Sequence, residues 1–317
     1  MKQFDHAEGP TPELESSKPK GRHTKGHFST PRASSKRRRR SRPPFYKRTP
    51  FKIFCIILCC VCFSLGAYLG ILYNEAKELK RLSQIVQENT TVPSTEPSLP
   101  STCETTADPT TMPTLTEPAE TQPDRTILPQ YLELSQKNPE LFGWIKIDGT
   151  RIDYPVMHTP DDPEKYLHTD FKEESSYAGI PFLDASCSET SDNLLIYGHN
   201  MLDGSMFRSL LKYESKTFWE SHPVIEFDTL YETQKYEVLS AFYDRVYYKT
   251  EDVFKFYQFI DAENEEEYND AVAHFKEKQL YETGVEAAYG DQLITLVTCA
   301  YHTDNGRFVV VARKIQD

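Results

Sequence analysis

The chain has 317 residues, of which 38% are hydrophobic, and this is enough for one sizeable buried core. A mean hydropathy of -0.59 and 21 prolines indicate long unfolded stretches besides that core. The net charge of -12 conceals two halves of opposite sign, because about 15 of the 36 lysines and arginines lie before residue 53 with only about 4 of the 48 acidic residues. The composition therefore excludes both a chain folded throughout and an evenly acidic one, and one folded domain is the economical expectation.

Residues 1–50 are rich in Ser, Pro, Lys and Arg and contain hardly any aliphatic side chains. Such a segment lacks the material for a core, so we predict a disordered basic tail. Its basic block at 36–40 could bind nucleic acid or act as a nuclear signal. Because an apolar segment follows at once, a role in membrane topology is the better interpretation, and we predict no nucleic-acid partner.

Residues 51–73 form the apolar segment, which carries no charge for 21 residues after Lys52. A helix of this length spans a hydrocarbon core of about 30 Å. The basic flank predicts a cytoplasmic N-terminus and an extracellular remainder. A cleaved signal peptide is the alternative, but the apolar run is longer than a usual signal peptide core and no convincing cleavage site follows. We therefore predict a single-pass signal anchor in the cell membrane.

Residues 74–126 connect this segment to the folded part. The stretch 74–89 has helical composition and should extend the span outward, whereas 90–124 is mostly Thr, Pro, Ser and Glu. The second stretch predicts an extracellular spacer that could reach on the order of 100 Å in the polyproline form. An inert linker of no particular length is the alternative.

Residues 127–317 carry the predicted folded domain, which begins with a short helix near 128–138. An Asp-Gly pair at 148–149 between two alternating runs predicts a β-hairpin. About eight strands with few helices indicate a mostly β fold, a closed or nearly closed barrel. The expected strands are 144–147, 151–155, 179–183, 193–197, 224–227, 236–247, 292–298 and 307–314.

One clear helix interrupts the strands. Asn264 and Glu267 form a capping pattern, followed by apolar residues at helical spacing: Tyr268, Ala271, Val272 and Phe275. This stripe predicts packing against the barrel rather than a binding groove. The acidic run 261–267 lacks the spacing of an EF-hand, so we predict a solvated helix start and no metal site.

Three cysteines fall outside the apolar segment, and the other four within it are Cys55, Cys59, Cys60 and Cys62. An odd number leaves at least one thiol free unless it pairs between chains. Cys103 lies in the spacer and Cys187 in a polar loop, whereas Cys299 ends an apolar run. A strand end gives the rigid support that a catalytic side chain requires, so Cys299 is the candidate nucleophile.

Arg307 opens the next apolar run after the polar connector 300–306. If the two runs pair as an antiparallel hairpin, Cys299 and Arg307 lie side by side at one barrel edge. A fixed guanidinium can donate two hydrogen bonds to a carbonyl oxygen that becomes negative during attack. The alternative is an ordinary surface ion pair.

A cysteine nucleophile needs a proton partner, because the thiolate attacks and a free thiol has a pKa of about 8.5. His199 follows the strand 193–197 and Gly198, a glycine expected to let the backbone turn sharply. A lone histidine is usually structural, but Cys299 and Arg307 together favour a catalytic role for His199. His302 falls in the connecting turn, where we expect it to be exposed.

At these residues the chain resembles the sortases, membrane-anchored cysteine transpeptidases of Gram-positive bacteria. The family signature is Thr-Leu-x-Thr-Cys with an arginine on the next strand and a histidine upstream, matched by 295–299, Arg307 and His199. The resemblance extends from about Leu128 to Lys314 and implies the eight-stranded sortase barrel. The long interval before residue 292, with its extra helix, is most similar to class B. Position 297 is valine where class B usually has serine, and Asp162-Pro163-Glu164 lacks the aromatic residue of a class C lid.

The resemblance implies that Cys299 attacks a threonine carbonyl in a C-terminal sorting motif of a secreted protein, of the Asn-Pro-x-Thr-Gly or Leu-Pro-x-Thr-Gly type. His199 would move protons and Arg307 would hold the oxyanion. An amine of the peptidoglycan precursor or of a pilin would accept the acyl group from the thioester. Val297, Thr298 and Asn200 are expected to bind substrate, with the connection 248–290 as a wall. Ordinary strand packing is an equal alternative for these last assignments. No cofactor is implied.

Three other functions stay open on the sequence alone. A secreted cysteine protease would use the same Cys299 and His199 but hydrolyse the acyl-enzyme instead of transferring the acyl group to an amine. A noncatalytic anchored binding module would follow if Cys299 formed a disulfide with Cys187 or Cys103. Within the family, wall anchoring and pilus polymerisation differ only in the accepting amine, which the sequence does not reveal.

Overall fold

The computed structural model describes residues 49–91 and 125–316. The predicted tail, except for its last two residues, and most of the predicted spacer, including Cys103, lie outside this part. The chain divides into two compact units, Met1–Val61 and Cys62–Asp317, and the second contains every strand described here.

The first described element is the helix α1, Thr49–Thr91. It runs without a break through both the apolar segment 51–73 and the helical extension predicted for 74–89. By length and composition α1 is a candidate membrane span, and no residue of its most apolar window is buried. The apolar segment and its predicted helical extension therefore form one continuous helix.

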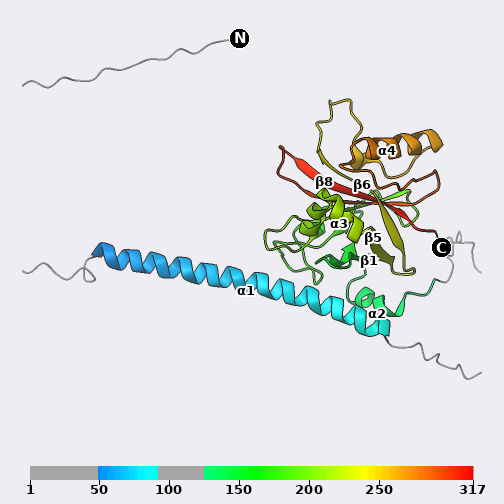
Figure 1. Ribbon diagram of the computed structural model, residues 1–317. Helices are drawn as coiled ribbons and strands as arrows, with labels where there is room; N and C mark the ends of the chain where they lie inside the picture. Colours follow the sequence, from blue (N-terminus) through cyan, green and yellow to red (C-terminus); the bar gives the residue numbers. More distant parts are fainter. Residues whose placement is uncertain (1–48, 92–124, 317) are drawn as a thin grey trace, which may run out of the picture. The chain divides into compact units, whose positions relative to one another are not determined.

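The second unit is built on a closed eight-stranded barrel in the order β1-β2-β3-β4-β7-β8-β6-β5 (Figure 1). The mostly β fold and the eight-stranded barrel predicted from the sequence are confirmed. The strands are β1 Leu141–Lys146, β2 Asp153–Met157, β3 Phe182–Leu183, β4 Asn193–Tyr197, β5 Val224–Thr229, β6 Lys235–Arg245, β7 Leu293–Cys299 and β8 Gly306–Lys314.

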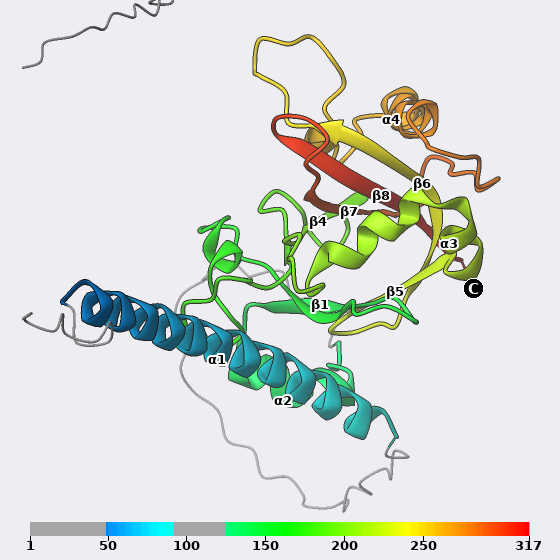
Figure 2. The ribbon, with the colours of Figure 1, turned by 60° about the vertical axis from the view of Figure 1, so that its left-hand side comes forward.

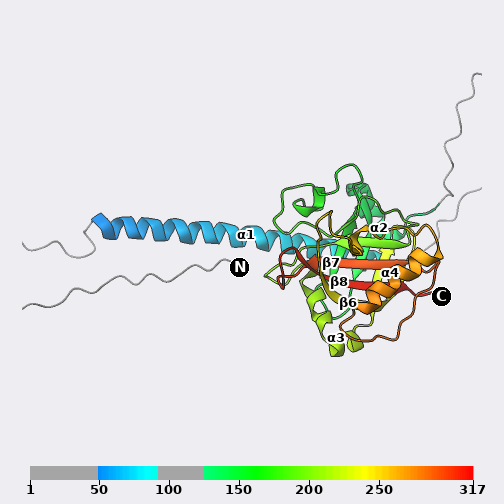
Figure 3. The same ribbon diagram turned by 90° about the horizontal axis from the view of Figure 1, so that it is seen from above.

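Pairing in the barrel is mixed, and this decides where the strand ends meet. β4 and β7 run parallel, with Tyr197 opposite Val297, so both strands end at the same edge of the barrel. β7 and β8 form an antiparallel hairpin in which Cys299 lies opposite Arg307. Figure 2 and Figure 3 show β8 between β7 and β6 from two sides.

The strand β3 is shorter than the predicted run 179–183. Gly179 has a positive φ of 57°, which is not a strand conformation, and Pro181 has no N–H to donate to a ladder. The carbonyl of Pro181 still accepts a hydrogen bond from the Met157 N–H at 3.0 Å. Only the last two residues of the predicted run, Phe182 and Leu183, therefore have strand conformation.

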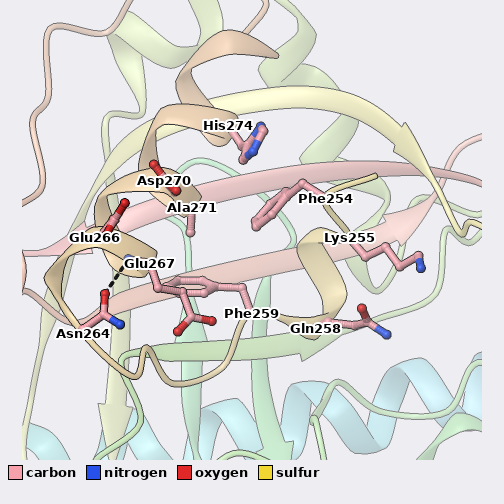
Figure 4. Close-up of a pocket in the computed structure, with 10 residues that line it drawn as sticks. All are labelled: Phe254, Lys255, Gln258, Phe259, Asn264, Glu266, Glu267, Asp270, Ala271 and His274. Atoms are coloured by element: carbon pink, nitrogen blue, oxygen red, sulfur yellow. Dashed lines mark hydrogen bonds between the residues drawn. The ribbon is translucent and has the colours of Figure 1, made fainter. Parts of the chain in front are cut away.

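Helices cover the barrel, and α4 is the one predicted in the interval before β7. Its cap is formed as expected, since the Asn264 side chain accepts a hydrogen bond from the Glu267 N–H at 3.1 Å (Figure 4). Phe275 of α4 stacks on Phe242 of β6, with ring centroids 6.1 Å apart. Burying one such ring contributes about 1.5–3 kcal/mol. All four apolar residues of the predicted stripe are buried, so its predicted packing against the barrel is confirmed. The helical elements of this unit are α2 Pro129–Lys137, η2 Lys165–Leu167, η3 Phe207–Glu214, α3 Lys216–Ser221, η4 Phe256–Gln258 and α4 Glu265–Glu277.

Candidate active site

The ends of β4 and β7 and the start of β8 meet at one edge of the barrel. The turn from β7 to β8 depends on Gly306, because a Cβ there would lie 2.3 Å from the carbonyl oxygen of Ala300. Asn305 takes a left-handed φ of 55°, which asparagine tolerates better than most residues. This tight turn sets the register that puts Cys299 beside Arg307, as the sequence predicted.

A groove of about 490 Å³ opens at this edge. The structure brings five of the six predicted site residues into its lining: His199, Val297, Thr298, Cys299 and Arg307. Asn200 is not among the lining residues. The connection 248–290 contributes none of them either, so the expected wall from that segment is absent. The remaining lining comes from residues before His199: Pro163, Glu164, Leu167, Phe182, Asp184, Ala185, Ser186, Tyr197 and Gly198.

The Cys299 thiol is free and half-buried. Cys187 is also free, so the two do not form the disulfide that a noncatalytic module would require. The Cys187 side chain is buried, donates to the Asn193 carbonyl at 3.4 Å, and has its pKa raised to about 12 by that burial. Of these two thiols, only Cys299 lines the groove, where a substrate could reach it.

A backbone carbonyl holds the imidazole of His199 in place. Its Nε2 lies 2.9 Å from the carbonyl oxygen of Leu167. Because a carbonyl only accepts, Nε2 carries the proton and Nδ1 is left as the acceptor. In the described part of the chain no hydrogen bond joins this imidazole to the Cys299 thiol. The two groups therefore border the same groove without a direct hydrogen bond between them.

Gly198, which precedes the histidine, has a role other than the sharp turn expected from the sequence. Its φ is not among the positive values, so no left-handed turn occurs there. The ring of Phe207 fills the space instead, and a Cβ on Gly198 would lie 2.6 Å from that ring. The glycine is required for close packing rather than for its conformational freedom.

The Arg307 guanidinium is anchored by its own hairpin. Nη1 donates to the carbonyl oxygens of Asn305 at 3.2 Å and Gly306 at 3.0 Å. In the described residues Nε and Nη2 have no hydrogen-bond partner. These free donors on a fixed, half-buried guanidinium suit the stabilisation of an oxyanion.

One wall of the groove, made by residues 163–167 and 182–186, was not predicted from the sequence. In this wall the Tyr197 hydroxyl donates to Asp184 at 3.1 Å, and burial together with that carboxylate raises the tyrosine pKa. Because a strand was predicted over 179–183, the residues that follow its end could have been predicted to lie at the edge of the barrel. No comparable pattern marks 163–167, which reaches the groove only through tertiary packing.

A second hollow of about 490 Å³ lies along α4 (Figure 4). Its polar lining includes the carboxylates of Glu266 and Asp270, with Lys255 and His274 nearby. The His274 ring stacks on Phe254 with centroids 4.6 Å apart. No thiol or hydroxyl is among the residues that line it, so this hollow lacks a nucleophile for acyl transfer.

Comparison with known proteins agrees with this geometry. The Sortase domain family model matches residues 145–315, more than half of the chain. The chain belongs to the sortase family, and it is therefore a cysteine transpeptidase. Sortase B of Staphylococcus aureus is 33% identical over 183 residues, covering 56% of this chain and 72% of that protein. Sortase B of Listeria monocytogenes is 35% identical over 185 residues, covering 56% and 71%.

The chain is also similar to solved structures of class B sortases. A Bacillus anthracis sortase B in complex with AAEK1 has a TM-score of 0.60 at 28% identity and covers 78% of this chain and 100% of that one. A Staphylococcus aureus sortase B–substrate complex has a TM-score of 0.59 at 26% identity and covers 77% and 97%. The predicted resemblance to class B is confirmed, although Val297 departs from the usual serine.

Proposed function

We propose that this transpeptidase cleaves a C-terminal sorting motif after threonine and transfers the acyl part to an amine, with Cys299, His199 and Arg307 as the catalytic residues. The observation that carries the proposal is the convergence of a free thiol, an imidazole and a guanidinium on one groove. Each has a separate chemical task, and no cofactor is needed for any of them.

In the first half, the thiolate of Cys299 attacks the threonine carbonyl and a C–S bond forms. The negative charge that develops on the carbonyl oxygen is stabilised by the free N–H donors of Arg307. The C–N bond then breaks, and His199, carrying on Nδ1 the proton that the Cys299 thiol gave up, delivers that proton to the leaving amine. The products are a thioester on Cys299 and a released C-terminal peptide.

In the second half, an amine attacks the thioester carbonyl. His199, now neutral, accepts a proton from the amine while Arg307 again holds the oxyanion. Collapse of the intermediate breaks the C–S bond, forms an amide and expels the Cys299 thiolate, and the proton that His199 took from the amine restores the starting thiolate and imidazolium. Water can replace the amine, in which case the outcome is hydrolysis.

The proposed donor is a secreted protein with an Asn-Pro-x-Thr-Gly-like or Leu-Pro-x-Thr-Gly-like motif. The proposed acceptor is an amine of the peptidoglycan precursor, so that proteins are anchored to the cell wall. Support comes from class B relatives, one solved with its substrate and one complexed with triglycine. Pilus assembly differs only in using a pilin lysine as the acceptor.

We further propose that α1 anchors the enzyme in the cell membrane of a Gram-positive bacterium, with the barrel outside. Support comes from the apolar composition of α1 and the basic residues that precede it. Labelling intact cells with a membrane-impermeant maleimide tests the orientation. With the labelled thiols located by peptide mass spectrometry, Cys299 should react in intact cells, whereas the thiol at position 16 of a Ser16→Cys variant should react only after permeabilisation. Labelling of Ser16→Cys in intact cells would overturn the orientation.

Product analysis tests the transfer reaction. Full-length protein in detergent micelles is incubated with peptides of both motif types, with and without triglycine, and the products are identified by mass spectrometry. We expect cleavage after threonine and, with triglycine, an amine-capped product. Cys299→Ala should abolish both products, and Cys187→Ala should retain them. Cleavage without any capture of the amine would favour a protease.

A further inference from the structure

The catalytic histidine and cysteine lie on two strand ends that a side chain ties together. The last backbone link between these ends runs from the Gly198 N–H to the Val297 carbonyl at 3.1 Å. Beyond it, the side-chain amide of Asn200 donates to the carbonyl oxygen of Cys299 at 2.6 Å. The two links flank His199, so they fix its backbone relative to that of the nucleophile.

The orientation of the Asn200 amide is unambiguous. Arg208 Nη1 donates to Asn200 Oδ1 at 2.9 Å, and arginine has no acceptor. The carbonyl of Cys299 has no donor, so Nδ2 must face it. Asn200 is 7% exposed, and at this depth a lost partner leaves a polar group that water does not readily satisfy.

The backbone around Asn200 is fixed as well. Asn200 forms an isolated antiparallel bridge with Met206, and the Phe207 N–H donates to the His199 carbonyl at 2.9 Å. Met206 has a positive φ of 51°, which a non-glycine side chain adopts only where its surroundings enforce it. The loop that carries Asn200 is thus closed on itself, and its amide points to the nucleophile segment rather than to substrate.

We propose that Asn200 is a positioning residue, which holds the Cys299 segment against the His199 segment while Arg208 holds the amide. This inference rests on the proposed function for its catalytic consequence. A displacement of about 1 Å between reacting groups costs on the order of 10²-fold in rate, so the tie affects turnover rather than affinity.

Kinetics of peptide transfer separate positioning from substrate binding. Asn200→Asp keeps the size and the contact to Arg208 but cannot donate to the Cys299 carbonyl. We expect this variant and Asn200→Ala to lower kcat about 10- to 100-fold, with KM within about twofold of the native value. Asn200→Gln retains the donor and should restore part of kcat. A rise in KM with unchanged kcat would overturn the inference and make Asn200 a substrate-binding residue.

Asn193, the first residue of the strand β4 that leads to Asn200, provides a matched control. It is fully buried, donates to the Phe259 carbonyl at 2.7 Å, and accepts from the Thr295 hydroxyl at 2.7 Å. Asn193→Ala should lower thermal stability while kcat per folded enzyme stays within about twofold. If Asn193→Ala lowers kcat as much as Asn200→Asp, the effect is general destabilisation and the inference fails.

A measurement without substrate keeps the inference apart from the proposed function. The rate of alkylation of Cys299 by iodoacetamide is followed against pH by peptide mass spectrometry. In Asn200→Ala, which removes the contact without adding a charge, the pH profile should move toward that of His199→Ala, because both changes alter the position of the imidazole relative to the thiol. A profile identical to the native one would overturn the inference. If the native enzyme processes no peptide, the proposed function fails while this profile still decides the role of Asn200.

Discussion

Arg307 illustrates how one side chain can be fixed and still available. Its Nη1 is bound to two carbonyls of its own hairpin, and the rest of the guanidinium lines the groove with donors to spare. A lysine supplies a charge at this place but neither the planar fork nor the two anchors. The pairing of Arg307 with Cys299 across the hairpin was predicted from the sequence, whereas the anchoring by Asn305 and Gly306 was not.

Arg307→Lys should lower kcat by about 10²–10³-fold with little change in KM, because the lost donors act on the charge that develops in the transition state. Steady-state kinetics of peptide transfer measure both constants. Arg313→Lys is the matched control on the same strand, since within residues 49–91 and 125–316 the side-chain partner of Arg313 is Glu237, at 3.5 Å. Native kcat in Arg307→Lys would exclude a role of the guanidinium in the oxyanion.

The buried thiol of Cys187 leads to a prediction of how the free energy of unfolding depends on pH. Burial raises its pKa to about 12 in the folded state, from an ordinary value of 9.0. The folded protein therefore keeps this proton longer than the unfolded chain, so the stabilisation is complete below about pH 9 and is lost as pH rises toward 12. Urea unfolding between pH 7 and 11 should show a shallower alkaline loss of stability in Cys187→Ala. Equal slopes for the two proteins would contradict this assignment.

At the scale of elements, the contact between the end of β4 and η3 is set by a missing side chain. Gly198→Ala would place a Cβ 2.6 Å from the Phe207 ring. We expect a loss of about 1–3 kcal/mol in the free energy of unfolding, and lower kcat because His199 is adjacent. Urea unfolding and peptide kinetics check both effects. The double variant Gly198→Ala/Phe207→Leu should recover part of each, and a fully stable single variant would refute the packing argument.

The cap of α4 gives a prediction on stability alone. Asn264→Ala removes the acceptor for the Glu267 N–H and should cost about 0.5–2 kcal/mol, while Asn264→Ser should retain most of the cap. Because no residue of α4 lines the catalytic groove, kcat should be unchanged in both variants. Thermal unfolding and kinetics of the two variants check this. A large fall in kcat in Asn264→Ala would mean that α4 reaches the reaction after all.

The elements that the sequence predicted best are those with a strong local pattern. β4 matches the predicted 193–197 in both bounds, and α4 begins directly after its predicted cap at Asn264. The length of β3 was overestimated because the prediction followed the apolar composition of 179–183 and gave too little weight to Gly179 and Pro181. The groove wall 163–167 was missed because irregular segments have no period, and only the folded chain brings them to the catalytic edge.

At the scale of the whole molecule, the parallel pairing of β4 and β7 is the feature that makes the site. It carries two residues about 100 positions apart in sequence to one edge, and the β7–β8 hairpin adds the third. Family resemblance predicted these three residues and the barrel together. It did not predict that Asn200 would face the Cys299 carbonyl, since that depends on the conformation of the loop 200–206.

The most direct test of the central claim is intact-protein mass spectrometry of the full-length enzyme mixed with sorting-motif peptides in the absence of an amine. We predict a mass increase equal to the peptide portion up to threonine, located on Cys299 and removed by hydroxylamine, as a thioester requires. Cys299→Ala should show no increase, and Cys187→Ala should show the native one. An adduct on another residue, or cleavage of a peptide by Cys299→Ala, would contradict the assignment of Cys299 as the nucleophile.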